Sequence, residues 1–251
     1  MILRVEDIDM ARCRPEFRRA LIDDLLWFGL RWSEGPDVGG PHLPYVQSAR
    51  RDEYQRALIA LRDSGHIYPC RCSRKDVAGA ATAPHDENEE PIYPGTCRDL
   101  NLQVEPPGDV NWRFRVHDGE VIRFEDGRLG AQRAIAGQDF GDFVVWRRDD
   151  VPAYQLAVVV DDAAMKISEV VRGSDLLIST FRQLLLYRAL GLAAPSFYHT
   201  PLVTDEEGRR LAKRHASLSL RALRESGITP EEIRARSTSL LSRAESTDLV
   251  V

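Results

Sequence analysis

LRVEDID, residues 3–9, is the stretch that decides the expected fold, because it combines a strand pattern with a run of charges. Leu3 and Val5 alternate with charged neighbours, which is typical of a β-strand with one buried face. Ligands of open α/β sheets bind at the carboxyl ends of parallel strands. The charges therefore indicate either a pocket for a cationic group or a solvated strand end. They are carried by Arg4, Glu6, Asp7 and Asp9.

A helix is expected next along the chain. Its apolar stripe repeats at helical spacing, and the helix is predicted to start near Pro15 and to end at Gly29. The stripe consists of Phe17, Leu21, Leu25 and Phe28. A strand followed by a helix is half of a βαβ unit, which favours the α/β class.

Composition narrows the class of protein. The 251 residues suit one large domain or two small ones, and 43% hydrophobic with 29% charged residues is ordinary for a globular protein. The sequence holds no apolar run near the roughly 20 residues of a membrane span and no signal-peptide pattern. A net charge of −5 means that contact with nucleic acid needs a local basic patch. Four cysteines are too few for a disulfide framework, so a reducing cytoplasm is expected.

The middle of the chain predicts a helix followed by clustered cysteines. Residues 49–64 carry an apolar face with Tyr54, Leu58 and Leu61, and Gly65 is expected to end the helix. The segment YPCRCSRKDV follows directly, and YPGTC comes after a polar stretch. The two segments hold three of the four cysteines, so this region is where metal binding is expected.

The cysteines and one tyrosine form the candidate metal site. Cys70 and Cys72 can direct two thiolates at one centre from a tight turn, and Cys97 adds a third sulfur to the four ligands that zinc takes. Tyr93 is the candidate fourth ligand, although tyrosine is uncommon on zinc. The alternatives for that position are His85, Asp86 and water. Three reduced structural cysteines without a metal are the other interpretation.

The region after the cysteines predicts strands. Short alternating runs over residues 110–150, broken by glycines, are typical of an antiparallel β insertion. The runs are WRFRV, EVIRFED and DFVVWRR. The apolar stretch over residues 156–160 predicts a strand or a helix that is buried on both faces.

Two helices are predicted in the second half from their capping residues. Thr180 and Gln183 have the spacing of a capping box for a helix that ends at Gly191. Thr229 and Glu232 predict another helix start in the same way. A serine-rich tail from about residue 237 is expected to fray.

A basic segment lies between these two helices. Residues 209–224 contain six arginines and lysines and no acidic residue. Such a segment is able to neutralise a polyphosphate as it reacts, and a solvated basic helix face is the alternative. The basic residues are Arg209, Arg210, Lys213, Arg214, Arg221 and Arg224.

Taken in order, these segments resemble the class I glutamyl-tRNA synthetases. LRVEDID is similar to their LRIEDTD-type strand, YQLAVVVDDAAMKISEVVRGSDLL to their amino-acid-binding segment, and RLAKR to their KMSKS-type loop. The segments YPCRCSRKDV, APHDENEEPIYPGTC and RRLAKRHASLSLRALRESG resemble the short glutamyl-Q tRNA(Asp) synthetase branch of this family. The resemblance runs from Leu3 to about Ile233.

The resemblance implies a Rossmann-like class I aminoacyl-tRNA synthetase catalytic domain with an inserted zinc-bearing, β-rich subdomain and no anticodon-binding domain. The expected first part of the catalytic domain is 1–68, the insertion 69–150, the second part with the KMSKS-like loop 151–236, and the flexible tail 237–251. Family members carry a strand with a HIGH-type motif ahead of the LRIEDTD-type strand. Roughly 35 to 40 residues of that pattern are not in the sequence, judged against a βα unit, so an N-terminally truncated catalytic domain is expected.

The resemblance also implies a ligase. ATP, with Mg²⁺, would activate L-glutamate, and the glutamyl group would pass to the queuosine base of tRNA(Asp). By position, glutamate is held by Glu6, Tyr154 and Arg172, with the carboxylate of Glu6 and the guanidinium of Arg172 expected to face each other across one cavity. Lys213 is the expected catalytic and ATP-binding residue. One structural Zn²⁺ would be bound by Cys70, Cys72, Tyr93 and Cys97.

The expected protein is cytoplasmic and monomeric and has no membrane partner. Two other functions stay open at this point. One is a catalytic fragment of a conventional glutamyl-tRNA synthetase. The other is a non-catalytic RNA-binding remnant, which the missing HIGH-type motif favours.

Overall fold

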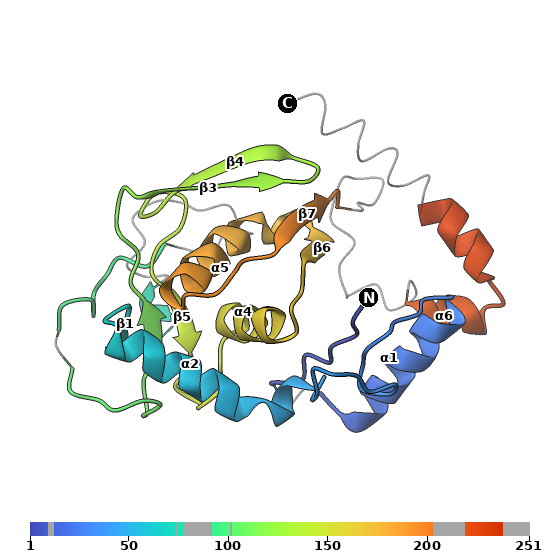
Figure 1. The fold of residues 1–251 in the computed structure, drawn as a ribbon, viewed down its shortest axis with the longest axis horizontal. Coiled ribbons are helices and arrows are strands. Elements are labelled where there is room, and N and C mark those ends of the chain that lie inside the picture. The colour runs from blue at the N-terminus through green and yellow to red at the C-terminus, as the bar shows by residue number, and fades with distance from the viewer. Residues whose placement is uncertain (10–12, 74, 78–91, 101, 203–218, 238–251) are drawn as a thin grey trace. The chain divides into compact units, whose positions relative to one another are not determined.

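The computed structural model describes residues 1–9, 13–73, 75–77, 92–100, 102–202 and 219–237 (Figure 1). Its chain divides into two compact units. Unit 1 comprises Met1–Val46, Gly173–Asp175 and Thr200–Val251. Unit 2 comprises Gln47–Arg172 and Leu176–His199. The predicted basic loop with Lys213 and the predicted tail from 238 onward lie outside the described residues.

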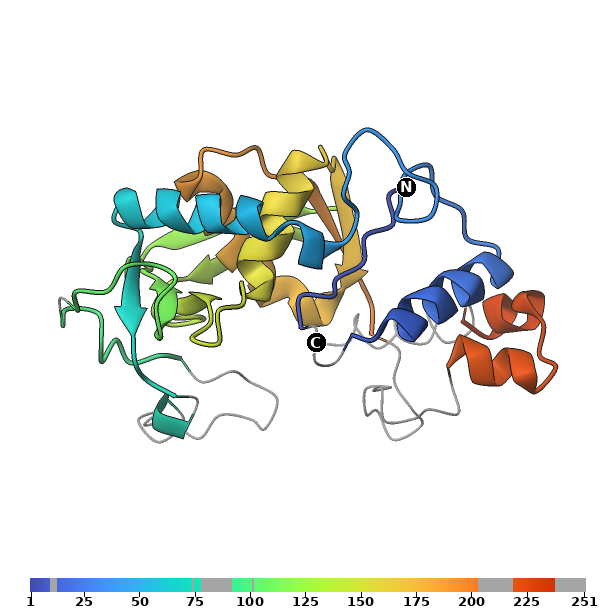
Figure 2. The same ribbon diagram turned by 90° about the horizontal axis from the view of Figure 1, so that it is seen from below.

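Unit 1 is built around the helix α1, Pro15–Trp27. Its limits confirm the predicted helix, with proline in the first turn and Gly29 after its end at a φ of +92°. The short helix α6, Leu220–Glu225, packs beside α1 (Figure 2). The guanidinium of Arg221 on α6 donates to the carboxylate of Asp24 on α1 at 3.0 Å.

The predicted strand over residues 3–9 does not form a regular strand, which corrects the sequence analysis. Parallel pairing occurs only as isolated bridges, Ile2 with Glu34 and Val5 with Val46. A strand needs successive paired residues along one neighbour. Here Ile2 and Val5 pair with two separate segments, each through a single bridge. Among the described residues, no neighbouring segment therefore forms a continuous ladder with residues 3–9, despite their alternating pattern.

Unit 2 contains two sheets (Figure 1). The first is antiparallel, with the order β1-β2-β5, and the second is mixed, with the order β4-β3-β7-β6. The strands of the first sheet are β1 Ile67–Cys70, β2 Asn111–Phe114 and β5 Phe143–Trp146. Those of the second are β3 Val121–Asp126, β4 Gly130–Ile135, β6 Glu169–Gly173 and β7 Ser196–Thr200.

The predicted β-rich region over residues 110–150 is therefore confirmed, and it contains one strand, β4, that the alternating runs did not predict. β4 has the sequence GAQRAI, which lacks a strong alternation, and it pairs with β3 over its whole length. β3 also pairs in parallel with β7, at Asp126 and Phe197. The pattern alone predicted an antiparallel insertion and did not indicate this parallel contact.

Among the described residues of unit 2, three α-helices lie against the sheets, and α4 packs against both of the others (Figure 1). They are α2 Arg51–Asp63, α4 Tyr154–Ala164 and α5 Leu177–Ala189. The predicted core face of α2 is confirmed, because Tyr54, Leu58 and Leu61 are each at most 1% exposed. The apolar run over residues 156–160, predicted as a strand or a helix, lies in α4.

A buried carboxylate joins α2 to α4. Asp161 is fully buried and accepts hydrogen bonds from Arg50 Nε at 2.7 Å, Gln47 Nε2 at 2.8 Å and the Tyr54 hydroxyl at 3.0 Å. A buried charge is stable only when it is paired and hydrogen bonded, and this carboxylate meets both conditions. The start of α2 is therefore fixed against the middle of α4.

One of the two predicted capping boxes is confirmed. Thr229 and Glu232 cap each other, with the Thr229 backbone N–H and hydroxyl donating to Glu232 Oε2 at 2.8 and 2.9 Å, and these bonds lower the pKa of the Glu232 carboxyl. The predicted capping box at Thr180 and Gln183 is wrong. A 3-10 turn at Ser174–Leu176 begins the helix earlier, so both side chains lie inside α5.

None of the helices in the described ranges combines the length and the apolar composition needed to cross a membrane.

Candidate active site and metal centre

The sulfur atoms of the predicted metal site lie together. Those of Cys70, Cys72 and Cys97 are all within 4.8 Å of one another. Cys70 ends β1, Cys72 follows two residues later, and Cys97 lies in a turn after Tyr93. The Tyr93 hydroxyl is 3.4 Å from Cys70 Sγ and 3.5 Å from Cys72 Sγ. The structure therefore brings together the four side chains that the sequence singled out.

Their acid–base properties differ within the cluster. Burial opposes ionisation of Cys97, but hydrogen bonds from Tyr93 and the Arg71 backbone outweigh it and lower the pKa of its thiol to about 7. Burial raises the pKa of Cys72 to about 11 and also raises that of Tyr93. Three soft sulfur donors around one point, with a phenol beside them, are a donor set that suits zinc.

An arginine supports this cluster from β2. Arg113 is buried, and its Nε donates to Cys70 Sγ at 3.3 Å. The guanidinium carbon lies 3.9 Å from the centre of the Tyr93 ring, and Nη1 donates to the Asp142 carbonyl at 3.0 Å. A cation at this position offsets negative charge on thiolates and fixes their orientation, as outer partners of metal ligands do. Sequence reasoning missed Arg113, because it lies in an ordinary strand pattern with no metal-ligand spacing.

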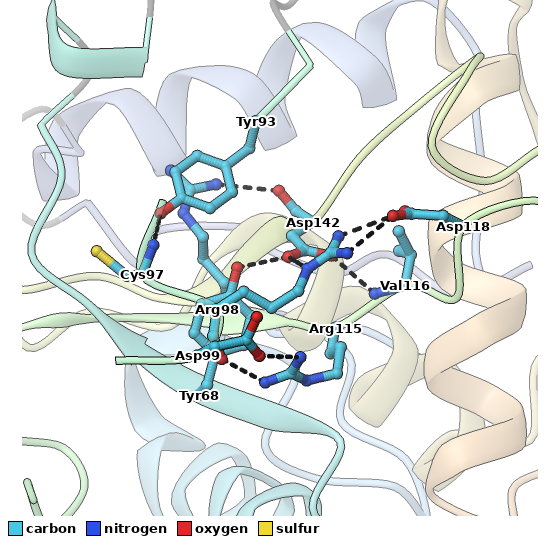
Figure 3. Close-up of polar contacts among 10 residues, drawn as sticks. Tyr68, Tyr93, Cys97, Arg98, Asp99, Arg115, Val116, Asp118 and Asp142 are labelled. Atoms are coloured by element: carbon cyan, nitrogen blue, oxygen red, sulfur yellow. Dashed lines mark hydrogen bonds and ion pairs between the residues drawn. The ribbon is translucent and has the colours of Figure 1, made fainter. Parts of the chain in front are cut away.

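Asp142 anchors the turn that carries Cys97 (Figure 3). Its buried carboxylate accepts two hydrogen bonds from Arg98, both at 2.8 Å, one from the Tyr68 hydroxyl at 2.5 Å and one from the Val116 backbone N–H at 2.8 Å. Burial and the neighbouring carboxylate raise the pKa of Tyr68. Arg98 directly follows Cys97, so this network holds the third cysteine near the two on the sheet side.

Replacing Asp142 with asparagine is expected to destabilise the protein by about 3 kcal/mol, because the change removes the charge of one partner in a buried ion pair and turns an NH₂ donor toward groups that themselves donate. The change in free energy of unfolding is to be measured in denaturant. The matched control is Asp118→Asn, on the second carboxylate that Arg98 contacts, whose side chain is 61% exposed. The free energy of unfolding of this control variant is expected to fall by less than about 1 kcal/mol. Equal losses in the two variants would contradict the role of Asp142.

Two of the predicted glutamate-binding residues lie together in unit 2. Tyr154 begins α4, Arg172 lies on β6, and the two side chains share a hydrogen bond. Burial lowers the pKa of the Arg172 guanidinium, and the Tyr154 side chain opposes that shift. A half-buried arginine beside a phenol is suited to binding a carboxylate in a fork, with the hydroxyl orienting the ligand.

The structure does not place the other predicted site residues relative to this pair. Glu6 belongs to unit 1, where it is exposed and pairs with Arg4 at 3.2 Å. Since Glu6 and Arg172 lie in different units, the expected cavity between them stays a prediction. Lys213 lies outside the described residues.

The structure adds residues around Arg172 that the sequence analysis missed. Arg172 Nη2 donates to Thr180 Oγ1 at 2.6 Å, and its Nε donates to His199 Nε2 at 3.3 Å. His199 Nδ1 lies 2.6 Å from Asp126 Oδ2. The parallel contact of β3 with β7 brings Asp126 to this group, and no local sequence pattern signals such a contact.

Comparison with known proteins identifies the family. The family described as tRNA synthetases class I (E and Q), catalytic domain, matches residues 1–243. The chain therefore belongs to the class I tRNA synthetases, and its fold is their Rossmann-like catalytic domain with mixed sheets. The prediction of an enzyme of the ligase type is confirmed at the level of this family.

Individual relatives agree with the predicted branch. The glutamyl-Q tRNA(Asp) synthetase of Symbiobacterium thermophilum is 50% identical over 238 residues, which are 92% of this chain and 73% of that protein. The protein of the same name from Nitratidesulfovibrio vulgaris is 49% identical over 238 residues, which are 93% of this chain and 73% of that protein. The predicted resemblance to this branch is thereby confirmed.

A solved structure supports the fold. The glutamate-tRNA synthetase of Elizabethkingia anophelis matches with a TM-score of 0.73 and 29% sequence identity. The match covers 85% of this chain and 46% of that protein.

Proposed function

We propose that this protein activates L-glutamate with ATP and transfers the glutamyl group to the queuosine base of tRNA(Asp). The observation that carries the proposal is the half-buried Arg172 beside Tyr154, in a chain that is 50% identical to a protein named for this reaction. Glutamate has two carboxylates and one ammonium group. Its pocket therefore needs at least one cation, which Arg172 supplies, and one anion, which is the role proposed for Glu6.

In the first step an α-carboxylate oxygen of glutamate attacks the α-phosphorus of ATP. A bond from that oxygen to phosphorus forms, the bond to the β-phosphate oxygen breaks, and pyrophosphate leaves with the electron pair. The step needs no protein nucleophile, because positioning and stabilisation of charge supply the rate. We assign Arg172 and Tyr154 to holding the amino acid, and Lys213 to the charge that develops on pyrophosphate. ATP enters with Mg²⁺.

We further propose one structural Zn²⁺, held by Cys70, Cys72, Cys97 and Tyr93. The support is the distance of at most 4.8 Å between the sulfur atoms, together with the chemistry of the donors. When bound, the metal would cross-link the end of β1 to the turn after Tyr93. The inserted zinc-bearing subdomain and the predicted domain limits are proposed from the family resemblance.

Two measurements test the proposed function. Purified protein is expected to catalyse glutamate-dependent ATP–pyrophosphate exchange without tRNA, and aspartate and glutamine serve as control amino acids. Radiolabelled glutamate is then offered to three RNAs: tRNA(Asp) with queuosine, tRNA(Asp) without it, and tRNA(Glu). Labelling of the first RNA alone supports the proposal. Labelling of tRNA(Glu) would favour a conventional glutamyl-tRNA synthetase. ATP–pyrophosphate exchange that does not depend on glutamate would contradict both of these functions.

A conventional glutamyl-tRNA synthetase is the second candidate. The solved relative from Elizabethkingia anophelis carries that name, and its chain matches 85% of this one. The two candidates share the activation step and the residues around Arg172, so only the RNA arm of the experiment separates them.

A further inference from the structure

We propose that Asp126 and His199 are positioning residues that fix the orientation of the Arg172 guanidinium for a carboxylate of glutamate. The inference rests on the proposed function, since that function gives Arg172 its ligand. It is carried by a continuous set of polar contacts inside unit 2, which runs from the end of β3 through β7 to β6.

The histidine at the centre of this set is completely buried. His199 is 0% exposed and Asp126 is 2% exposed. A carboxylate only accepts hydrogen bonds, so the 2.6 Å contact between His199 Nδ1 and Asp126 Oδ2 places the proton on Nδ1. In the neutral imidazole the other nitrogen, Nε2, then carries a lone pair.

That lone pair faces the arginine. Arg172 Nε donates to His199 Nε2 at 3.3 Å, and Arg172 Nη2 donates to Thr180 Oγ1 at 2.6 Å. Thr180 Oγ1 is itself 3.1 Å from His199 Nε2. The guanidinium also lies over the Phe197 ring, with 5.3 Å between its carbon and the ring centre. One edge of the guanidinium is thus held by the protein, and its plane is fixed before a ligand arrives.

Asp126 is itself held in place. Its Oδ1 accepts from the backbone N–H groups of Leu129, Arg128 and His199 at 2.9, 3.1 and 3.3 Å. Burial alone would raise the pKa of this carboxyl, but these donors and the His199 ring outweigh burial and lower it. A buried polar pair adds little net stability compared with apolar residues. The specific effect of Asp126 is to hold His199 in the Nδ1–H tautomer, which leaves Nε2 free to accept the hydrogen bond from Arg172.

The sharpest test is Asp126→Asn. The amide oxygen of asparagine still accepts from the three backbone groups, but its NH₂ now faces His199 Nδ1. His199 must then carry its proton on Nε2, where it opposes the N–H of Arg172. The Michaelis constant for glutamate in ATP–pyrophosphate exchange is expected to rise by about 10- to 100-fold, while that for ATP changes less than about twofold.

A second measurement reports the tautomer without activity. In ¹⁵N-histidine-labelled protein, nitrogen chemical shifts distinguish the two neutral forms, and His199→Gln assigns the signal among the six histidines. Wild type is expected to show the Nδ1–H form and Asp126→Asn the Nε2–H form. The double variant Asp126→Asn/His199→Gln should bring the Michaelis constant back toward wild type, because an amide is able to turn its oxygen to the arginine.

The matched control is Asp139→Asn. Asp139 also caps a turn, accepting from the Ile135 backbone N–H at 2.6 Å, but its side chain is exposed, whereas that of Asp126 is buried. The Michaelis constants of this variant for glutamate and ATP in ATP–pyrophosphate exchange are expected to equal those of wild type. A switched tautomer with an unchanged Michaelis constant for glutamate would overturn the positioning role alone. A wild type that shows the Nδ1–H form but no glutamate-dependent exchange would instead overturn the proposed function.

Discussion

Replacing Arg172 with glutamine is expected to lower kcat/KM for L-glutamate in ATP–pyrophosphate exchange by about 1000-fold. Removing one partner from a desolvated, hydrogen-bonded charge pair costs about 4 kcal/mol, and each 1.36 kcal/mol is a factor of ten. The kcat/KM for ATP at saturating glutamate is expected to change far less. The kcat/KM of Arg172→Lys for glutamate should lie between those of wild type and Arg172→Gln, because lysine keeps the positive charge but lacks the planar guanidinium that binds a carboxylate through two hydrogen bonds.

The control for this variant is Arg188→Gln. Arg188 lies on α5, its side chain is 61% exposed, and it pairs with Glu120 at 2.6 Å. Its exchange kinetics are expected to equal those of wild type. Thermal unfolding of both variants separates loss of binding from loss of folded protein. If folded Arg172→Gln protein stayed within threefold of wild type for glutamate, Arg172 would not be the carboxylate ligand.

The second large effect concerns the metal centre. Wild-type protein is expected to contain about one zinc ion per chain, and a chelator should lower its Tm, because the affinity of a structural zinc site is part of the folding free energy. Cys97→Ser removes a sulfur donor that Asp142 and Arg98 hold in place. Its zinc affinity is expected to fall by more than about 100-fold, since losing even an outer partner costs about 10- to 100-fold.

Cys13→Ser is the matched control for the metal. Cys13 lies in unit 1 and is not one of the three clustered cysteines. This variant should keep the zinc content and the chelator response of wild type. Competition with a chromophoric zinc chelator gives the affinities, and elemental analysis gives the content. A folded wild type that holds no zinc and takes up none from a zinc salt would refute the metal assignment.

Local patterns predicted the positions of α1 and α2 and the buried face of α2, but Phe17 and Leu21 of the apolar stripe predicted on α1 are 58% and 48% exposed. The core face of α2, with Tyr54, Leu58 and Leu61, follows from helical periodicity, and Gly65 ends the helix because its φ of +74° costs a glycine little. The clustering of the cysteines was predicted in the same local way, because two of them are separated by one residue.

Features that depend on distant partners were not predicted. The strand over residues 3–9 was wrong, because pairing is a property of the neighbouring segments and not of the alternation itself. The predicted helix cap at Thr180 is wrong, because this residue lies inside α5 and its hydroxyl accepts a hydrogen bond from Arg172. His199 and Asp126 are joined across 73 positions, and a single sequence offers no signal for such a pair.

The wide spacing of these contacts has a consequence for biosynthesis. Asp161 bonds to Gln47 across 114 positions, and His199 bonds to Asp126 across 73. Contacts with large sequence separation form late, because the entropy of closing long loops must be overcome first. While the chain is on the ribosome, unit 2 cannot close its second sheet until β7 has emerged from the exit tunnel. Until then the edge of β3 that pairs with β7 stays open, and protection by a chaperone would matter most in that interval.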